Sequence, residues 1–296
     1  MKKSISIMLA MAVIVASFPF MVSASSLEVA GKDVGNYKME TGQIDLRDIQ
    51  EDMYVENGEV KIQNIQTAEA YELQKELSNS DNLNDLIAHM MSEGMVPEGI
   101  GYTIVDLKEV IDENGNSHLE PMTIRDMQAR GNGTTVSKGN LRLYIAASKI
   151  SAGKYKTVTT AQWTTDFQFS AETRPADGYD YISVTAPKDF EYSRSYFTST
   201  TSGLKNQITD YERVDMSYSS VVYKFKEFIN GVYSTKECAA WMNCDGEVSS
   251  KNSLFIGKYL HTWASVTPAI TIGPASVAFS PVSKSWQIVC DYKYPV

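Results

Sequence analysis

The sequence has few of the residues from which catalytic and metal sites are usually built, with three histidines and three cysteines among 296 residues. It contains no phosphate-binding loop, no dinucleotide-binding glycine motif and no His-Glu-x-x-His metal motif, and these absences argue against several large classes of enzyme. Cys238 and Cys244 are six residues apart, a spacing that matches no zinc pattern. We therefore expect no cofactor and no metal, and the sequence leans away from an enzyme.

Positive charge and long apolar runs are also scarce. The formal net charge is −9, whereas binding to nucleic acid needs a basic surface, so we expect no nucleic-acid partner. Beyond residue 24, no apolar run approaches the roughly 20 residues that a membrane-spanning helix requires. The mature chain is therefore expected to be soluble, with no integral membrane segment.

The first 24 residues have the three parts of a secretory signal peptide. Lys2 and Lys3 give a positive start, residues 5–16 are apolar except for Ser6, and small residues follow at 22–24. This order is typical of a signal that is removed on export. We predict cleavage after Ala24 and a secreted protein, either extracellular or periplasmic.

The remaining chain divides by composition at about residue 131. Residues 25–131 carry 22 acidic and 8 basic residues and contain no Phe or Trp, while residues 132–296 carry 14 acidic and 17 basic residues and all four Trp. We predict an acidic α+β segment followed by an aromatic-rich all-β domain. The stretch 130–133 is a candidate linker. If the acidic segment acts as a cap or pro-region, the chain is processed after Arg130; the alternative is that the two parts pack as an ordinary two-domain protein.

The acidic segment contains signals for both helices and strands. Residues 53–62 have two short runs around an Asn-Gly pair, which predicts a hairpin. The spacing of apolar residues predicts helices over 68–77 and 81–94. Strands are expected at 102–111 and 118–124, which makes this part a small α+β unit.

A calcium site between these two strands was considered and rejected. Asp112, Asn114 and Asn116 alternate, as ligands do in a calcium-binding loop, but Ser117 and Thr123 stand where such a loop needs Gly and Glu. An acidic hairpin turn is the expected structure.

The second part has an apolar period of two along most of its length. Short strands are expected at residues 141–145, 157–169, 181–186, 213–228, 254–260, 262–267, 269–272, 277–279 and 285–294. Many short strands with regular turns and almost no helical spacing are typical of an antiparallel β-sandwich or a barrel-like domain. The fold class is therefore mainly β.

All three cysteines lie in this second part. An exported protein meets an oxidising environment, which favours one disulfide with one thiol left over. Cys290 lies on the apolar face of the last strand and is expected to be buried. Cys244 is the preferred partner, and Cys238 is the alternative.

Two weak catalytic hypotheses remain. His261 adjoins Trp263 on a strand, but the sequence offers it no recognisable partner, so a strand histidine with an ordinary packing role is the alternative. Four carboxylates of one strand–loop region could form an acid–base pair for glycoside hydrolysis, or could simply be solvated: Asp177, Asp180, Asp189 and Glu191.

The aromatic content supports a different function. Aromatic faces stack on sugars and on partner proteins, although most of these side chains are expected in the core; the four tryptophans are Trp163, Trp241, Trp263 and Trp286. We therefore expect a secreted or envelope-facing β-sandwich binding module for a glycan or protein at a cell surface. The first alternative is a membrane-active or pore-forming protein that uses the Ser/Thr-rich stretch 191–210. The expected structure of that stretch is nevertheless a polar loop between two strands. The second alternative is a hydrolase with an unrecognised site.

Overall fold

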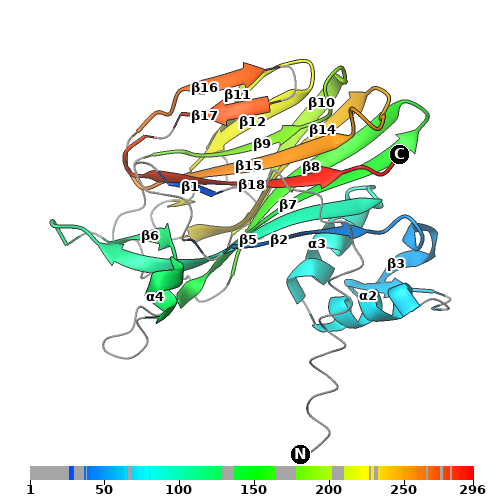
Figure 1. Cartoon of the computed structure of the whole chain (residues 1–296), viewed down its shortest axis with the longest axis horizontal. Coiled ribbons are helices and arrows are strands. Elements are labelled where there is room, and N and C mark those ends of the chain that lie inside the picture. The colour runs from blue at the N-terminus through cyan, green and yellow to red at the C-terminus, as the bar shows by residue number, and fades with distance from the viewer. Residues whose placement is uncertain are drawn as a thin grey trace, which may run out of the picture.

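The computed structural model is mainly β, as predicted, with two large antiparallel sheets packed face to face (Figure 1). The sheets form an open sandwich and do not close into a barrel among the described strands. The structure describes residues 27–29, 37, 39–63, 65, 68–79, 81–115, 117–128, 137–164, 178–201, 210–226, 228–229, 233–264, 266–273, 276–280 and 282–296.

The larger sheet contains eight strands. Six of them follow the order β10-β14-β8-β7-β5-β2, while β13 pairs with β14 and β6 pairs with β5. Their bounds are β2 Met39–Asp45, β5 Gly99–Ile111, β6 Ser117–Pro121, β7 Ser137–Ser151, β8 Lys154–Trp163, β10 Glu191–Thr201, β13 Phe228–Ile229 and β14 Tyr233–Asp245. β10 lies at one edge of this sheet.

The smaller sheet has six strands in the order β1-β18-β15-β9-β12-β11. Their bounds are β1 Leu27–Val29, β9 Asp180–Thr185, β11 Tyr211–Met216, β12 Ser220–Phe225, β15 Leu254–Thr262 and β18 Ser285–Lys293. A hairpin of β16 Ile270–Gly273 and β17 Ser276–Phe279 packs apolar side chains on the outer face of this sheet.

The main core lies between the two sheets. Leu141, Leu143 and Ile145 of β7 point into it because successive side chains of a strand alternate between its faces. Gly257 lets the sheets approach closely: a Cβ atom at this position would lie 2.7 Å from Cγ2 of Thr159. The predicted core face of β18, with Trp286 and alternate residues after it, is confirmed.

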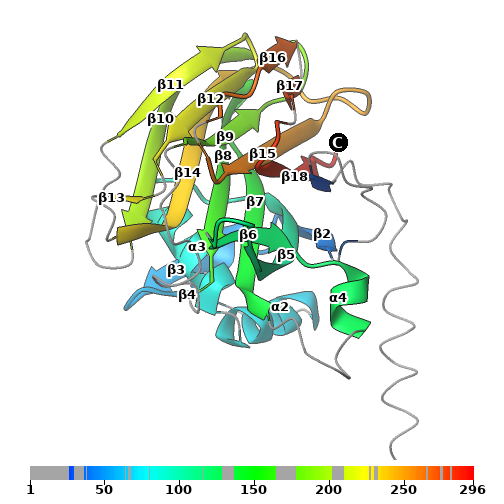
Figure 2. The ribbon, with the colours of Figure 1, turned by 90° about the vertical axis from the view of Figure 1, so that its left-hand side faces the viewer.

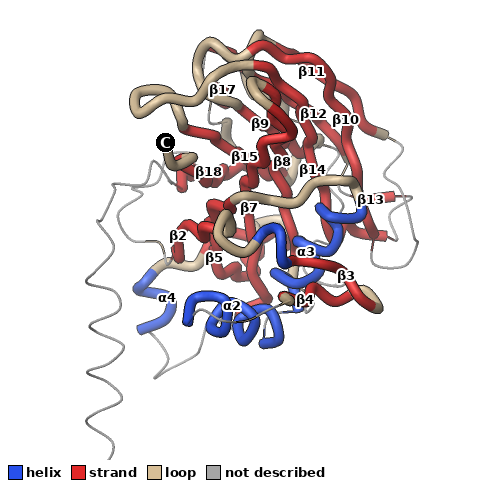
Figure 3. The backbone as a smooth tube through the Cα atoms, turned by 90° about the vertical axis from the view of Figure 1, so that its right-hand side faces the viewer, coloured by secondary structure: helices blue, strands red, loops and turns tan. Residues whose placement is uncertain are grey.

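The other face of the larger sheet is covered by two helices and a small hairpin, α2 Ala68–Asn79, α3 Asp81–Ser92, β3 Met53–Glu56 and β4 Glu59–Ile62. Figures 2 and 3 show both helices on this one side of the sheet. The hairpin and both helices were predicted. Leu86, Ile87 and Met90 of α3 are completely buried against this layer. None of the helices in the described part of the chain is long and apolar enough to cross a membrane.

The change in composition at about residue 131 does not coincide with a boundary between the two sheets. β5, from the acidic part, pairs antiparallel with β7, from the aromatic-rich part, and β1 pairs with β18. The acidic part therefore supplies strands to both sheets as well as the helical layer. The predicted signal peptide at 1–24 and the predicted processing site after Arg130 lie outside the described residues and stay predictions.

Several predicted element boundaries are wrong. The expected single strand at 213–228 is the hairpin β11–β12, and β14 was not predicted. The strand expected at 262–267 ends at Thr262. A short helix, α4 Ile124–Gln128, follows β6, because Thr123 caps it: Asp126 N–H donates to Thr123 Oγ1 at 3.1 Å, and Thr123 N–H donates back to Asp126 Oδ2 at 2.7 Å.

Candidate functional site

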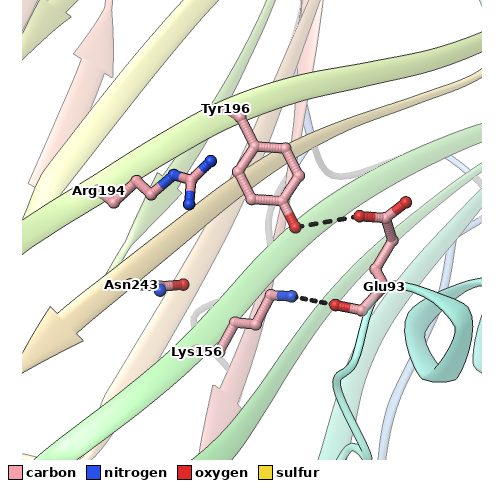
Figure 4. A pocket seen from close by; sticks show the side chains of 5 residues that line it. All are labelled: Glu93, Lys156, Arg194, Tyr196 and Asn243. Atoms are coloured by element: carbon pink, nitrogen blue, oxygen red, sulfur yellow. Dashed lines mark hydrogen bonds between the residues drawn. The ribbon is translucent and has the colours of Figure 1, made fainter.

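A pocket of about 330 Å³ opens on the outer face of the larger sheet, beside the helical layer. It is lined by Glu93, Lys156, Arg194, Tyr196 and Asn243. Figure 4 shows that these side chains come from three neighbouring strands and from the turn that follows α3. The site is therefore built by residues that lie far apart in the sequence.

The strand register places three polar residues in one row. Lys156 of β8 lies opposite Asn243 of β14, and Asn243 lies opposite Arg194 of β10. Neighbouring strands are about 4.8 Å apart, so directly opposite side chains on one face are close neighbours. The sheet thus presents two cationic side chains with a carboxamide between them.

A β-bulge in the edge strand gives Arg194 its orientation. Tyr192 packs against the main core, and the register shifts between Tyr192 and Arg194, leaving Ser193 as the extra residue. Without the bulge, Arg194 would share the inward face of Tyr192, two residues away. The Ser193 hydroxyl donates a hydrogen bond to the Asn243 carbonyl at 3.1 Å, which holds the bulge against β14.

A stacked aromatic pair forms one wall of the pocket. The rings of Tyr196 and Trp241 are 5.5 Å apart between centroids, with an angle of 5° between their planes. Trp241 is completely buried, and its Nε1–H donates to Thr198 Oγ1 at 2.9 Å. Packing and hydrogen bonding therefore fix the orientation of the half-exposed Tyr196 ring.

The turn after α3 closes the pocket on the opposite side. Gly94 has a left-handed φ of 74°, which glycine adopts readily at a helix C-terminus. This turn presents Glu93, whose carboxylate Oε2 accepts a hydrogen bond from the Tyr196 hydroxyl at 3.3 Å. Burial, followed by the nearby Glu93 carboxylate, raises the pKa of Tyr196 to about 12. The phenol is therefore neutral and a donor at ordinary pH.

Lys156 is a buried cation in this wall. Its Nζ donates to the Glu93 backbone carbonyl at 2.5 Å and lies 4.8 Å from the centroid of the Trp241 ring. Burial lowers the pKa of the Lys156 ammonium, Glu93 acts in the opposite direction, and Arg194 lowers it further. The two cations therefore repel one another.

Two other polar groups of the pocket have no partner in the part of the chain that the structure describes. The Arg194 guanidinium lies 5.9 Å from the Tyr196 ring centroid and makes no hydrogen bond or ion pair with a described residue. The Asn243 carboxamide oxygen is buried and accepts no hydrogen bond. A buried polar atom without a partner costs about 1–3 kcal/mol, so the Asn243 oxygen is suited to pairing with a ligand. Arg194 is exposed, and its guanidinium is accessible to one.

The structure places His261 away from the pocket, as a buried residue of strand β15 in the smaller sheet. Its Nδ1 lies 3.1 Å from Asp180 Oδ2, an oxygen that also accepts a hydrogen bond from the Tyr259 hydroxyl. Asp180 Oδ1 accepts the backbone N–H of Thr262 at 2.8 Å. His261 is completely buried, and Asp180 is 2 % exposed. This partner was not recognised from the sequence, and the network has no surface that a substrate could reach.

The other carboxylates do not join Asp180. Asp189 and Glu191 are exposed, whereas Asp180 is buried, and Asp177 lies outside the described residues. A glycosidase pair from this cluster is therefore not assembled among the described residues. Within the described chain, no group of three metal-binding side chains is close enough to hold an ion.

The predicted disulfide is not formed: Cys238, Cys244 and Cys290 are free and buried. Cys244 lies opposite Tyr155 on β8, while Cys290 lies near Thr159, four residues further along the same strand. Four residues of a strand span about 13 Å, whereas the Cα atoms of a disulfide are at most about 7 Å apart.

The tryptophans that suggested a binding surface are mostly buried. Trp163, Trp241 and Trp286 are at most 4 % exposed, and the half-buried Trp263 stacks on His118 with centroids 4.5 Å apart. None of the five residues that line the pocket was singled out from the sequence. The stretch that carries Tyr196 was expected to be a polar loop, and this expectation is wrong, because residues 191–201 form the edge strand β10.

Compared with known proteins, the chain matches no protein-family model, and no curated protein matches it significantly.

Proposed function

We propose that this is a binding module, secreted or facing the cell envelope, that engages a glycan at a cell surface through the pocket around Tyr196. The observation that carries the proposal is the convergence of unpartnered polar groups on a fixed aromatic ring. Ligand sites commonly combine an aromatic surface with a few placed hydrogen-bonding groups, and occupy about 300–1,000 Å³. A pocket of about 330 Å³ suits one sugar unit of a longer chain.

The preformed geometry supports binding to a rigid, polar ligand. The Tyr196 ring is held by Trp241 and Glu93, so it loses little conformational freedom when a ligand arrives. The pocket also lies beside the edge strand β10, where the sheet ends. A sugar chain can therefore extend from the pocket past the edge of the sheet.

The test is binding of the purified protein to an array of cell-surface and cell-wall glycans. We expect Tyr196→Leu to abolish binding, because it removes both the stacking surface and the hydroxyl. The matched control is Tyr218→Leu in the β11–β12 turn, since Tyr218 is 80 % exposed and does not line the pocket. Equal binding by the two variants would contradict the proposal.

A membrane-active function is the alternative, and it rests on the Ser/Thr-rich stretch that forms β10. In that case the protein would release dye from liposomes, and Tyr196→Leu would release dye as fast as the wild type. Glycan binding without dye release would favour the binding module.

A further inference from the structure

We infer that the sugar unit taken by this pocket is a sugar acid, whose carboxylate is held between Arg194 and Lys156. This inference rests on the proposed function, because it names the class of ligand for the same site. It follows from three features of the pocket: its net charge, its hydrogen-bonding groups that have no partner, and the bulge that brings Arg194 into one row with Asn243 and Lys156. We call these three residues the cationic row.

The described residues that line the pocket carry one more cation than anion. Lys156 and Arg194 are two strands apart in one row, whereas Glu93 is the one carboxylate among the described lining residues. Their mutual repulsion is relieved when a negative group lies between them. Hydrogen bonds from charged donors to a carboxylate are among the strongest that proteins make.

The remaining groups require a ligand that also donates hydrogen bonds. The Asn243 carboxamide oxygen is a buried acceptor without a partner, and the Glu93 carboxylate has acceptor sites beyond the one used by Tyr196. Sugar hydroxyls supply several such donors, whereas a phosphate dianion supplies at most one and, with twice the charge of a carboxylate, would be repelled more strongly by Glu93. A singly charged carboxylate on a hydroxylated ring fits both the cations and the acceptors.

The β-bulge in β10 places Arg194 on the face of the sheet that lines the pocket. An uninterrupted β10 would direct Arg194 into the core beside Tyr192, where a guanidinium could not be hydrated. With the bulge, Arg194 reaches the outer face in register with Asn243. The backbone register of β10 therefore sets the face of the sheet on which Arg194 lies.

The experiment compares acidic glycans with neutral counterparts of the same shape, by titration calorimetry on the full protein at low salt. The probes are trigalacturonate against its methyl ester, sialyllactose against its methyl ester, and inorganic phosphate. We expect at least one acid to bind about tenfold or more tightly than its neutral counterpart, as charge-assisted hydrogen bonds imply. Arg194→Gln should abolish this preference. The control, Arg213→Gln, should retain it, because Arg213 is an exposed arginine that donates to Tyr192.

The outcomes separate this inference from the proposed function. If acid and neutral forms bind equally and Tyr196→Leu abolishes both, the inference is wrong and the binding module stands. If phosphate binds as tightly as the sugar acids, the pocket is a general anion site and the sugar-acid assignment is wrong. If no member of any pair binds, both proposals are overturned. An acid preference that survives Arg194→Gln also contradicts the inference.

Discussion

Asp180 is the residue whose removal should destabilise this fold most clearly. Its carboxylate accepts hydrogen bonds from the Tyr259 hydroxyl, from the His261 ring and from the backbone N–H of Thr262, all in the interior. Asp180→Leu keeps the branched shape of the side chain but removes every acceptor. Three donors would then be buried without partners.

The magnitude follows from these three losses. Each unsatisfied buried donor costs about 1–3 kcal/mol, so the three donors together cost at least about 3 kcal/mol. We therefore expect Asp180→Leu to lower the free energy of unfolding by about 3 kcal/mol or more. Asp180→Asn should cost less, because its carbonyl can still accept the Thr262 N–H and its amino group can donate to the tyrosine and histidine.

Urea unfolding followed by tryptophan fluorescence measures this change, since the Trp163 and Trp286 rings lie 5.5 and 5.1 Å from the His261 ring. The control is Asp210→Leu, which removes a carboxylate that is 57 % exposed and paired with Lys226 at 3.7 Å. Such surface pairs contribute about 0–1 kcal/mol. If Asp180→Leu is as stable as this control, the network does not stabilise the fold and the reasoning is refuted.

Two further predictions concern the core between the sheets. Gly257→Ala should lower the free energy of unfolding by about 1–3 kcal/mol, the usual cost of overpacking, because the new Cβ would lie 2.7 Å from Thr159 Cγ2 and 3.0 Å from Cys290 Sγ; an unchanged thermal midpoint would contradict it. All three thiols should resist a thiol reagent in the native protein and react in urea. Burial raises the pKa of Cys244 to about 12, so the folded state holds this proton more tightly, and stability should fall as pH rises above the ordinary thiol pKa. Fast labelling of the native protein would show that the thiols are accessible.

Two predictable parts of the fold carry a clear local signal, a turn motif in one case and an apolar stripe in the other. The Asn-Gly turn of β3–β4 was recognised because Asn57 and Gly58 favour positive φ, and both have it, at 54° and 82°. The helix α3 was recognised from its apolar stripe. β14 was missed because the sandwich core covers one of its faces, and Trp241 with its neighbours packs the other face against the helical layer. A strand buried on both faces shows no alternation.

The candidate site was not predictable for a different reason. Its cationic row depends on the pairing of β8 with β14 and of β14 with β10, and no local pattern specifies which strands are neighbours. The face of the sheet on which Arg194 lies depends on the bulge at Ser193, because a shift of one residue along a strand exchanges its inward and outward faces. The composition of residues 191–210 indicated a polar loop, whereas the pairing that makes β10 a strand and the side of the sheet that Arg194 faces are properties of the assembled sandwich.

The position of β18 has a consequence for the order in which the protein folds. This strand lies between β1 and β15, so it pairs with residues 27–29 from the far end of the described chain and with residues 254–262. The core cannot close until residues 285–293 have left the ribosome, and folding must then join segments about 260 residues apart. Contacts of such long range make folding slow and expose unpaired edges to aggregation in the meantime. A nascent chain of this protein therefore depends on remaining unfolded, or on being held so, until β18 has been synthesised.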